Sequence, residues 1–125
     1  MFLKVLLSSF FLVPTIYCQS HLEKGISAYN QRHLGCIEDQ AKPEPISSAI
    51  SHFEKALDKK DDKYEASLYL LKSYYFKSKF VIKDKKVKKD LLKKGKDLGL
   101  SLVEKFPNSV EYRYCLLYTS PSPRD

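Results

Sequence analysis

The residues that most often carry chemistry are few in this 125-residue chain and do not fall at catalytic or metal-binding spacings. The three histidines, His21, His33 and His52, lack the short intervals at which side chains of one segment bind a metal ion together. Cys36 does not complete a ligand set with them, and no serine or cysteine occupies a nucleophile motif. We therefore expect isolated histidines, no metal, no cofactor and no enzymatic activity.

Glycines and carboxylates do not point to catalysis either. Gly95 and Gly99 fall inside a predicted helix, so they do not form a phosphate-binding loop. Acidic residues are abundant but scattered along the chain, and no pair is set apart by its spacing. Binding is the better expectation.

Helical periodicity dominates the chain, whereas strand alternation and tight hairpin turns are lacking. Apolar residues recur at intervals of three and four along successive segments. The expected helices cover residues 21–33, 45–59, 64–81 and, after a charged link at 83–86, a segment that ends at 106, with a fifth starting at 110. Residues 36–44 are expected to form a loop, because Pro43 and Pro45 push the residues before them, Lys42 and Glu44, out of helical conformation. The predicted fold class is all-α.

Residues 1–18 have the order of a secretory signal peptide: an early cation, Lys4, then an apolar run, then Pro14. The apolar run is much shorter than the roughly 20 residues of a transmembrane helix. We expect residues 1–18 to be removed and the protein to be exported, to the periplasm or outside the cell. An acylated Cys18 is the less favoured alternative, because bulky Tyr17 stands where a lipoprotein signal has a small residue.

The last eleven residues, CLLYTSPSPRD, match one reading frame of the adapter used in tagmentation sequencing libraries. We therefore expect residues 115–125 to be a non-native tail and the natural sequence of this stretch to end at Tyr114. On this interpretation, residues 19–114 form a helical fragment whose last repeat is incomplete. Cys36 is then the only cysteine of the mature segment, so an internal disulfide is not expected.

The chain is basic, with a formal net charge of +7. Ten cations fall between Lys77 and Lys96, where only Asp84 and Asp90 oppose them. All ten are lysines, and Phe80 is the single aromatic residue among them, which is typical of a solvated helix face. Export argues against nucleic acid as a partner, and a weak contact with an anionic membrane surface remains an alternative.

Two helix pairs share a spacing of small and aromatic residues that resembles the tetratricopeptide repeat. In the first pair the second-helix pattern is Ala49, Phe53 and Ala56. In the second pair it is Gly95, Gly99 and Leu102, followed by Pro107 at the position of the family's turn proline. The first-helix positions of the second pair are Leu68, Leu71, Lys72 and Tyr75, with Lys72 in place of the usual small residue. The resemblance implies an α-solenoid of antiparallel helix pairs.

Both pairs depart from the usual 34-residue period. The distance from Gly25 to Ala49 is 24 residues and that from Lys72 to Gly95 is 23, where the family has twelve. This regular insertion, together with the segment KKGKDLGLSLVEKFPNSVEYRY, resembles a divergent branch. That branch contains the eukaryotic regulator of microtubule dynamics proteins and the periplasmic T component of bacterial tripartite uptake transporters.

The resemblance implies a concave surface lined by the first helix of each pair. On the third helix the implied groove positions are Ala66, Tyr69, Ser73, Phe76 and Lys77. On the first helix they are Leu22, Ile26, Tyr29 and Asn30. Tyrosines suit such a surface because they combine a large apolar area with a polar tip.

Three functions remain open at this stage. The leading hypothesis is an exported, noncatalytic helical-repeat scaffold that binds a protein or peptide in its groove. The first alternative is a periplasmic accessory subunit of an uptake transporter that holds a small organic acid. The second is an envelope-associated structural protein whose lysine-rich helix touches anionic surfaces.

Overall fold

The computed structural model describes residues 18–119. Within that range the chain forms helices and no β-strand, so the all-α prediction is confirmed. The helices are α1 (His21–Asn30), α2 (Pro43–Ala56), α3 (Lys63–Phe80), α4 (Lys85–Lys105) and α5 (Val110–Thr119), with a short 3₁₀ turn, η1 (Lys60–Asp62), before α3. The predicted signal peptide lies outside the described residues except for Cys18, which is exposed.

Local capping chemistry explains where the helices begin. The Ser20 hydroxyl accepts from the backbone N–H of Glu23, and the Glu23 carboxylate accepts from that of Ser20, both at 3.2 Å. This reciprocal capping box starts α1. The Asp84 carboxylate accepts from the N–H of Val87 at 2.9 Å and starts α4. Pro43 starts α2, two residues earlier than predicted, because the first helical turn does not need its N–H.

The connection between α1 and α2 begins sooner than the sequence suggested. α1 ends at Asn30, and residues 31–35 form turns that close on Gly35. Gly35 has a φ of +74°, a left-handed conformation that glycine adopts without strain. The loop is tied to the end of α3 because the N–H of Ala41 donates to the carbonyl of Phe80 at 2.9 Å.

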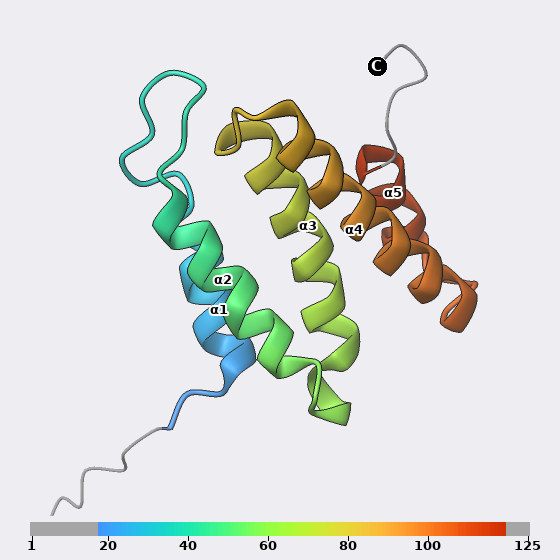
Figure 1. The fold of residues 1–125 in the computed structure, drawn as a ribbon. Helices are drawn as coiled ribbons and strands as arrows, with labels where there is room; N and C mark the ends of the chain where they lie inside the picture. The colour runs from blue at the N-terminus through green and yellow to red at the C-terminus, as the bar shows by residue number, and fades with distance from the viewer. Residues whose placement is uncertain (1–17, 120–125) are drawn as a thin grey trace, which may run out of the picture.

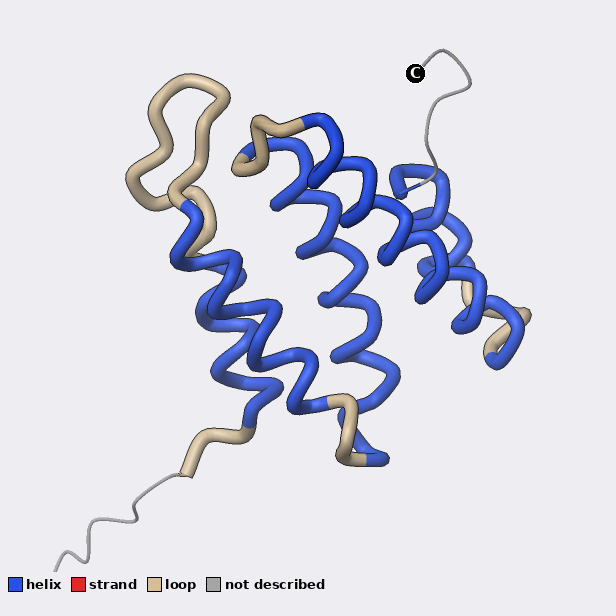
Figure 2. Tube along the Cα trace, viewed as in Figure 1, coloured by secondary structure: helices blue, strands red, loops and turns tan. Residues whose placement is uncertain are grey.

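The helices pack in chain order. α1 lies against α2, α2 against α3 and α3 against α4, while α5 contacts both α3 and α4. Figure 1 shows α3 between the α1 and α2 pair on one side and the α4 and α5 pair on the other. The loops lie at alternate ends of the helices, so consecutive helices run in opposite directions (Figure 2).

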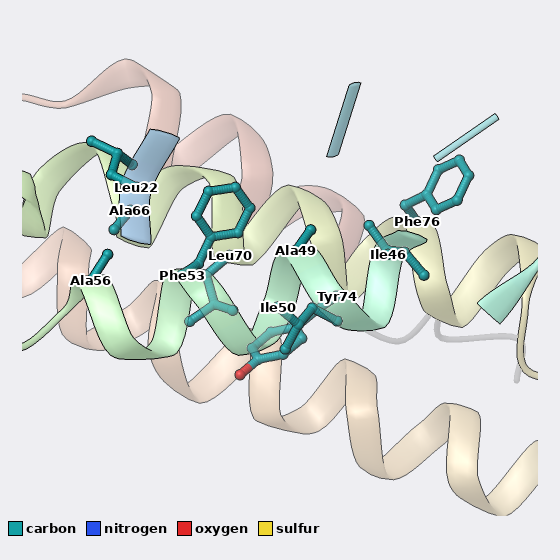
Figure 3. Close-up of a cluster of buried hydrophobic side chains, with 10 residues drawn as sticks. All are labelled: Leu22, Ile46, Ala49, Ile50, Phe53, Ala56, Ala66, Leu70, Tyr74 and Phe76. Carbon is teal, nitrogen blue, oxygen red and sulfur yellow. The ribbon is translucent and has the colours of Figure 1, made fainter. Parts of the chain in front are cut away.

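The larger core lies between α1, α2 and α3 (Figure 3). Its centre is Phe53, which is fully buried. Phe53 reaches α1 at Gly25, where an added Cβ would lie only 2.6 Å from the ring atom Cε1. The buried members of this core are Leu22, Ile46, Ala49, Ile50, Phe53, Ala56, Ala66, Leu70, Tyr74 and Phe76.

A smaller core joins α3, α4 and α5 and includes Leu71, Leu102, Tyr112 and Cys115. The Tyr112 hydroxyl donates to the carbonyl of Tyr64 at 2.8 Å, which ties α5 to the start of α3.

Helix α5 continues across the boundary that the sequence suggested after Tyr114. Cys115 is buried, and an added Cβ on Gly99 would lie 2.8 Å from Cδ1 of Leu116. These two residues are apolar and fall on the face of α5 that meets α3 and α4, so they extend the smaller core. The rest of the expected tail, residues 120–125, lies outside the described residues.

Candidate functional site

A hollow of about 410 Å³ opens between the end of α1, the middle and end of α3, and α5. Its volume falls in the range of about 300–1,000 Å³ that is typical of ligand pockets. The lining side chains are aromatic, aliphatic or basic, apart from one cysteine, and none of them is Asp or Glu. They are Tyr29, Arg32, His33, Leu71, Lys72, Tyr75, Phe76, Phe80, Tyr114 and Cys115. A larger space of about 510 Å³ is lined, among the described residues, by Cys18, Gln19, Glu23 and Lys24.

Arg32 is the most constrained charged group of this hollow. Its guanidinium carbon lies 4.0 Å from the centre of the Tyr29 ring and 5.5 Å from that of Phe76. The Nη1 group donates to the carbonyl of Tyr29 at 2.9 Å. The Nε atom is buried and has no hydrogen-bond partner among the described residues. The rings and the helix end therefore hold the cation in place without neutralising it.

Lys72 supplies the second positive charge. It is exposed on α3, with its ammonium 5.4 Å from the centre of the Tyr69 ring. Within the described part of the chain neither Lys72 nor Arg32 forms an ion pair; the pair found there joins Lys94 to Glu54 at 3.3 Å. The carboxylate of Glu111 is occupied by the hydroxyls of Ser109 and Tyr64, at 3.1 and 3.2 Å. The lining of the hollow therefore carries two cations and no acidic side chain, and Glu111, which lies outside the lining, interacts with Lys72 through its charge.

Two titratable groups that line the hollow have raised pKa values. Burial raises the pKa of the Tyr29 phenol, and the positive charge of Arg32 only partly offsets this effect. Burial also raises the pKa of the Cys115 thiol, although Lys72 opposes the shift. A protonated thiol is a poor nucleophile.

The predicted groove residues separate into two groups. Tyr29 and Phe76 both line the hollow. Tyr69 lies outside its lining, stacked on Phe53 with ring centres 5.3 Å apart and meeting Tyr29 edge-on at 5.4 Å. Ser73 is fully buried, and its hydroxyl donates to the carbonyl of Tyr69 at 2.7 Å. Lys77 is half-buried near the end of α3 and does not line the hollow.

The other implied groove positions are also divided. Leu22 and Ala66 belong to the larger core, with 8% and 0% of their surface exposed. Ile26 is partly buried against the same core, and Asn30 is exposed. The open part of the α1 and α3 surface is therefore confined to the end where Tyr29 and Phe76 lie.

The residues expected to pack repeat against repeat are mostly buried. Those without exposed surface are Ala49, Phe53, Ala56 and Leu71, and Gly95, Gly99 and Leu102 are buried on α4. Leu68 is partly buried against the smaller core, and Pro107 is exposed after α4. Tyr75 differs from the others because it lines the hollow.

Sequence reasoning missed Arg32 and His33 as site residues, and it singled out Lys72 only as a departure from the repeat pattern. Arg32 and His33 were placed inside the first helix, whereas they lie in the turns after α1. His33 contacts the Phe76 ring edge-on at 5.1 Å. A usable signal was the run Tyr29 to His33, which places an aromatic and two basic residues beside a helix end.

The expectation of isolated histidines is wrong for His21 and His52. Their Nδ1 atoms are 3.2 Å apart, so one ring N–H donates to the other ring nitrogen. The ring centres are 5.5 Å apart, which means that the two nitrogens point at each other. The pair joins the start of α1 to α2, and its members are 31 residues apart in the chain. Burial, followed by the charges of His21, Lys55 and Lys24, lowers the pKa of His52.

Within residues 18–119 no cluster of three or more His, Cys, Asp or Glu side chains is placed to hold a metal ion. Among the described helices none combines the length and the apolar character needed to cross a bilayer. No protein-family model, curated protein or solved structure matches the chain.

Proposed function

We propose that this chain is an exported, noncatalytic helical-repeat protein that binds a peptide or protein segment in the hollow between α1, α3 and α5. The observation that carries the proposal is the hollow itself. It combines aromatic walls from Tyr29, Tyr75 and Phe76 with two cations, Arg32 and Lys72, that form no close ion pair among the described residues. Export is proposed from the signal-peptide pattern of residues 1–18.

The order of packing supports a repeat architecture. On a tetratricopeptide-like interpretation, α1 and α2 form one pair, α3 and α4 form the next, and α5 begins a third. Small residues lie at close helix contacts, as expected for such pairs: Ala49 is fully buried, and Gly99 faces Leu116 and Leu71. The first helices of the pairs, α1, α3 and α5, all contribute to the hollow.

Peptide binding fits the chemistry of the walls. Aromatic side chains provide large contact areas at a low cost in conformational entropy, and tyrosine adds a hydrogen-bonding tip. The edge-on contact between Tyr29 and Tyr69, and the stacking of Tyr69 on Phe53, anchor the Tyr29 wall on the larger core. A wall supported in this way is preorganised, which lowers the cost of binding.

A second candidate function is binding of a small organic acid, as in an accessory subunit of an uptake transporter. The observation behind this candidate is the volume of the hollow, about 410 Å³, which is large enough for a small molecule.

The experiment is a selection of binders from a random peptide library displayed on phage, followed by affinity measurements on variants of the full chain. Lys72→Glu reverses a charge in the hollow, whereas Lys86→Glu reverses an exposed charge on α4 that lies outside it. We expect Lys72→Glu to weaken the selected peptide about tenfold or more and Lys86→Glu to change it about twofold or less. Equal effects of the two variants would remove the hollow as the binding site. Failure to select any peptide, together with binding of small organic acids, would favour the second candidate.

A further inference from the structure

The proposed function leaves the chemistry of the ligand open, and the two cations of the hollow narrow it. Arginine carries five N–H donors in a planar fork and cannot lose its charge near pH 7. Within residues 18–119 the Arg32 guanidinium forms one hydrogen bond to the chain, from Nη1 to the carbonyl of Tyr29. The Nε donor is buried without an acceptor among the described residues. Most of the donor capacity of this group is therefore unused by the chain.

The position of the guanidinium is nevertheless defined. It stacks over Tyr29 at 4.0 Å and lies 5.5 Å from the centre of Phe76, and its Nη1 is fixed by a backbone carbonyl. A surface arginine normally loses side-chain entropy when it binds an anion, which offsets much of the gain. An arginine held by two rings and a helix end has already lost much of that freedom, so it binds an anion at a lower cost.

No carboxylate of the described residues lies in the lining of the hollow around Arg32. No Asp or Glu lines the hollow, and Lys72 adds a second positive charge to it. Glu111 lies outside the lining, where hydrogen bonds from its backbone and from the Ser109 and Tyr64 hydroxyls, with a smaller effect of the Lys72 charge, lower its pKa. The anion that complements this site has to come from the ligand. The aromatic walls beside the cations suit an apolar or aromatic body attached to that anion.

From this arrangement we infer that the hollow selects ligands that carry a carboxylate, which Arg32 binds and Lys72 attracts as a second positive charge. The rings of Tyr29 and Tyr75 hold an aromatic or apolar group next to that carboxylate. This inference rests on the proposed function. In a peptide, such a ligand is an acidic residue beside an aromatic one, or a C-terminal aromatic residue. Arg32 lies in the turns after α1 and Lys72 lies on α3, so both charged groups come from the part of the hollow outside α5.

The test uses two small probes that differ only in charge: N-acetylphenylalanine, which carries a carboxylate, and N-acetylphenylalanine amide, which does not. Each is titrated into the ¹⁵N-labelled full chain, and backbone amide shifts are followed. We expect the acid to shift amides near Tyr29, Arg32 and Phe76 at millimolar concentration, and the amide to bind about tenfold more weakly. That preference should decrease as salt is added.

Variants assign the preference to residues. Arg32→Gln should make the two probes bind equally, and Lys72→Gln should reduce the preference without abolishing it. The matched controls Arg113→Gln and Lys86→Gln change exposed residues outside the hollow and should keep the full preference. Lys72→Gln also keeps the test decisive if the loss of Arg32 disturbs the turns after α1, because Lys72 is exposed on a helix.

Two results would overturn the inference. If acid and amide bind the hollow equally well, the site recognises an apolar body and not a carboxylate, and the proposed function still stands. If neither probe shifts the hollow, carboxylate selection fails as well. The proposed function fails separately, when library peptides bind Lys72→Glu as well as the unaltered chain.

Discussion

The ring of Phe53 on α2 stacks on the ring of Tyr69 on α3, with centres 5.3 Å apart and an angle of 19° between the planes. Phe53 is fully buried, so this contact fixes Tyr69 against the core and turns it away from the lining of the hollow. Tyr69 meets Tyr29 edge-on, and Tyr29 in turn supports Arg32. A chain of ring contacts therefore connects the core to the hollow.

Gly25→Ala should destabilise the protein even though alanine is the better helix former. The new methyl group would lie 2.6 Å from Cε1 and 2.7 Å from Cδ1 of Phe53. Because the Phe53 ring is stacked on Tyr69, it cannot move aside cheaply. Overpacking of a core costs about 1–3 kcal/mol, while the gain in helix propensity is about 1 kcal/mol. We expect a net loss of about 1 kcal/mol in urea-induced unfolding.

Gly99→Ala is the matched control for that variant. Its new methyl group would approach Cδ1 of Leu116 at 2.8 Å, which is the end of a flexible, half-buried side chain. Leu116 can rotate, so the unfolding free energy should stay the same or rise by up to about 1 kcal/mol. Equal stabilisation by both substitutions would show that Phe53 is not packed closely against α1.

Tyr74→Phe tests the polar contact that joins three helices. The buried Tyr74 on α3 donates to Oε1 of Glu54 on α2 at 3.1 Å, and Lys94 on α4 reaches the same oxygen at 3.3 Å. Burial, then the Glu54 charge and this hydrogen bond, raise the pKa of Tyr74, so its hydroxyl remains a donor. We expect a loss of about 0.5–1.5 kcal/mol on removing the hydroxyl, measured by thermal or urea unfolding.

Lys94→Ala should cost less, because Lys94 and Glu54 are 62% and 46% exposed. Exposed ion pairs contribute about 0–1 kcal/mol and weaken with salt. A larger loss for Lys94→Ala than for Tyr74→Phe would reverse the order of importance proposed for this contact.

The contact between His21 and His52 should make stability depend on pH. The lowered pKa of His52 means that the folded chain resists protonation below pH 6.5 more than the unfolded chain does. The unfolding free energy contributed by this group is therefore present above about pH 6.5 and decreases as the pH falls through the folded-state pKa. His52→Gln should flatten the slope between about pH 7.5 and 5.5 relative to the unaltered chain.

The control for this experiment is His33→Gln, which changes a histidine that contacts Phe76 and not this pair. It should keep the slope of the unaltered chain. If His52→Gln keeps that slope as well, the pair does not contribute to acid sensitivity.

The helices were largely predictable because apolar residues at intervals of three and four mark them without reference to distant contacts. Pro43 and Gly35 show where that method is less accurate: the first extends α2 toward its N-terminus, and the second follows a helix that ends early. Such boundaries depend on individual backbone conformations, which periodicity does not encode. The spacing also placed Ala49, Gly95 and Gly99 on the apolar faces of their helices, and all three are buried.

The site was predictable only in part. Tyr29 and Phe76, which the family resemblance placed in a groove, line the hollow, but Tyr69 and Ser73 are held by Phe53 and by a backbone carbonyl. The orientation of these two side chains depends on which neighbouring residue lies closest in the fold, and a single sequence does not reveal that neighbour. The contact between His21 and His52 was not predictable for the same reason, since it joins residues of two different helices.

Ser73→Ala should have little effect on either stability or binding. The buried hydroxyl donates only to the carbonyl of Tyr69 one turn earlier, and alanine is a better helix former than serine. We expect a change of less than about 1 kcal/mol in unfolding free energy and an unchanged affinity for a selected peptide. A large loss of affinity in a folded Ser73→Ala variant would return Ser73 to the binding surface.

The most direct test of the hollow as the binding site is photo-cross-linking of a library-selected peptide to the full chain. A benzophenone side chain is placed either at position 33, on the rim of the hollow, or at position 86, on the exposed side of α4. The account predicts cross-links to the peptide from position 33 and only background labelling from position 86. Labelling from position 86 alone, or equally from both positions, would contradict it.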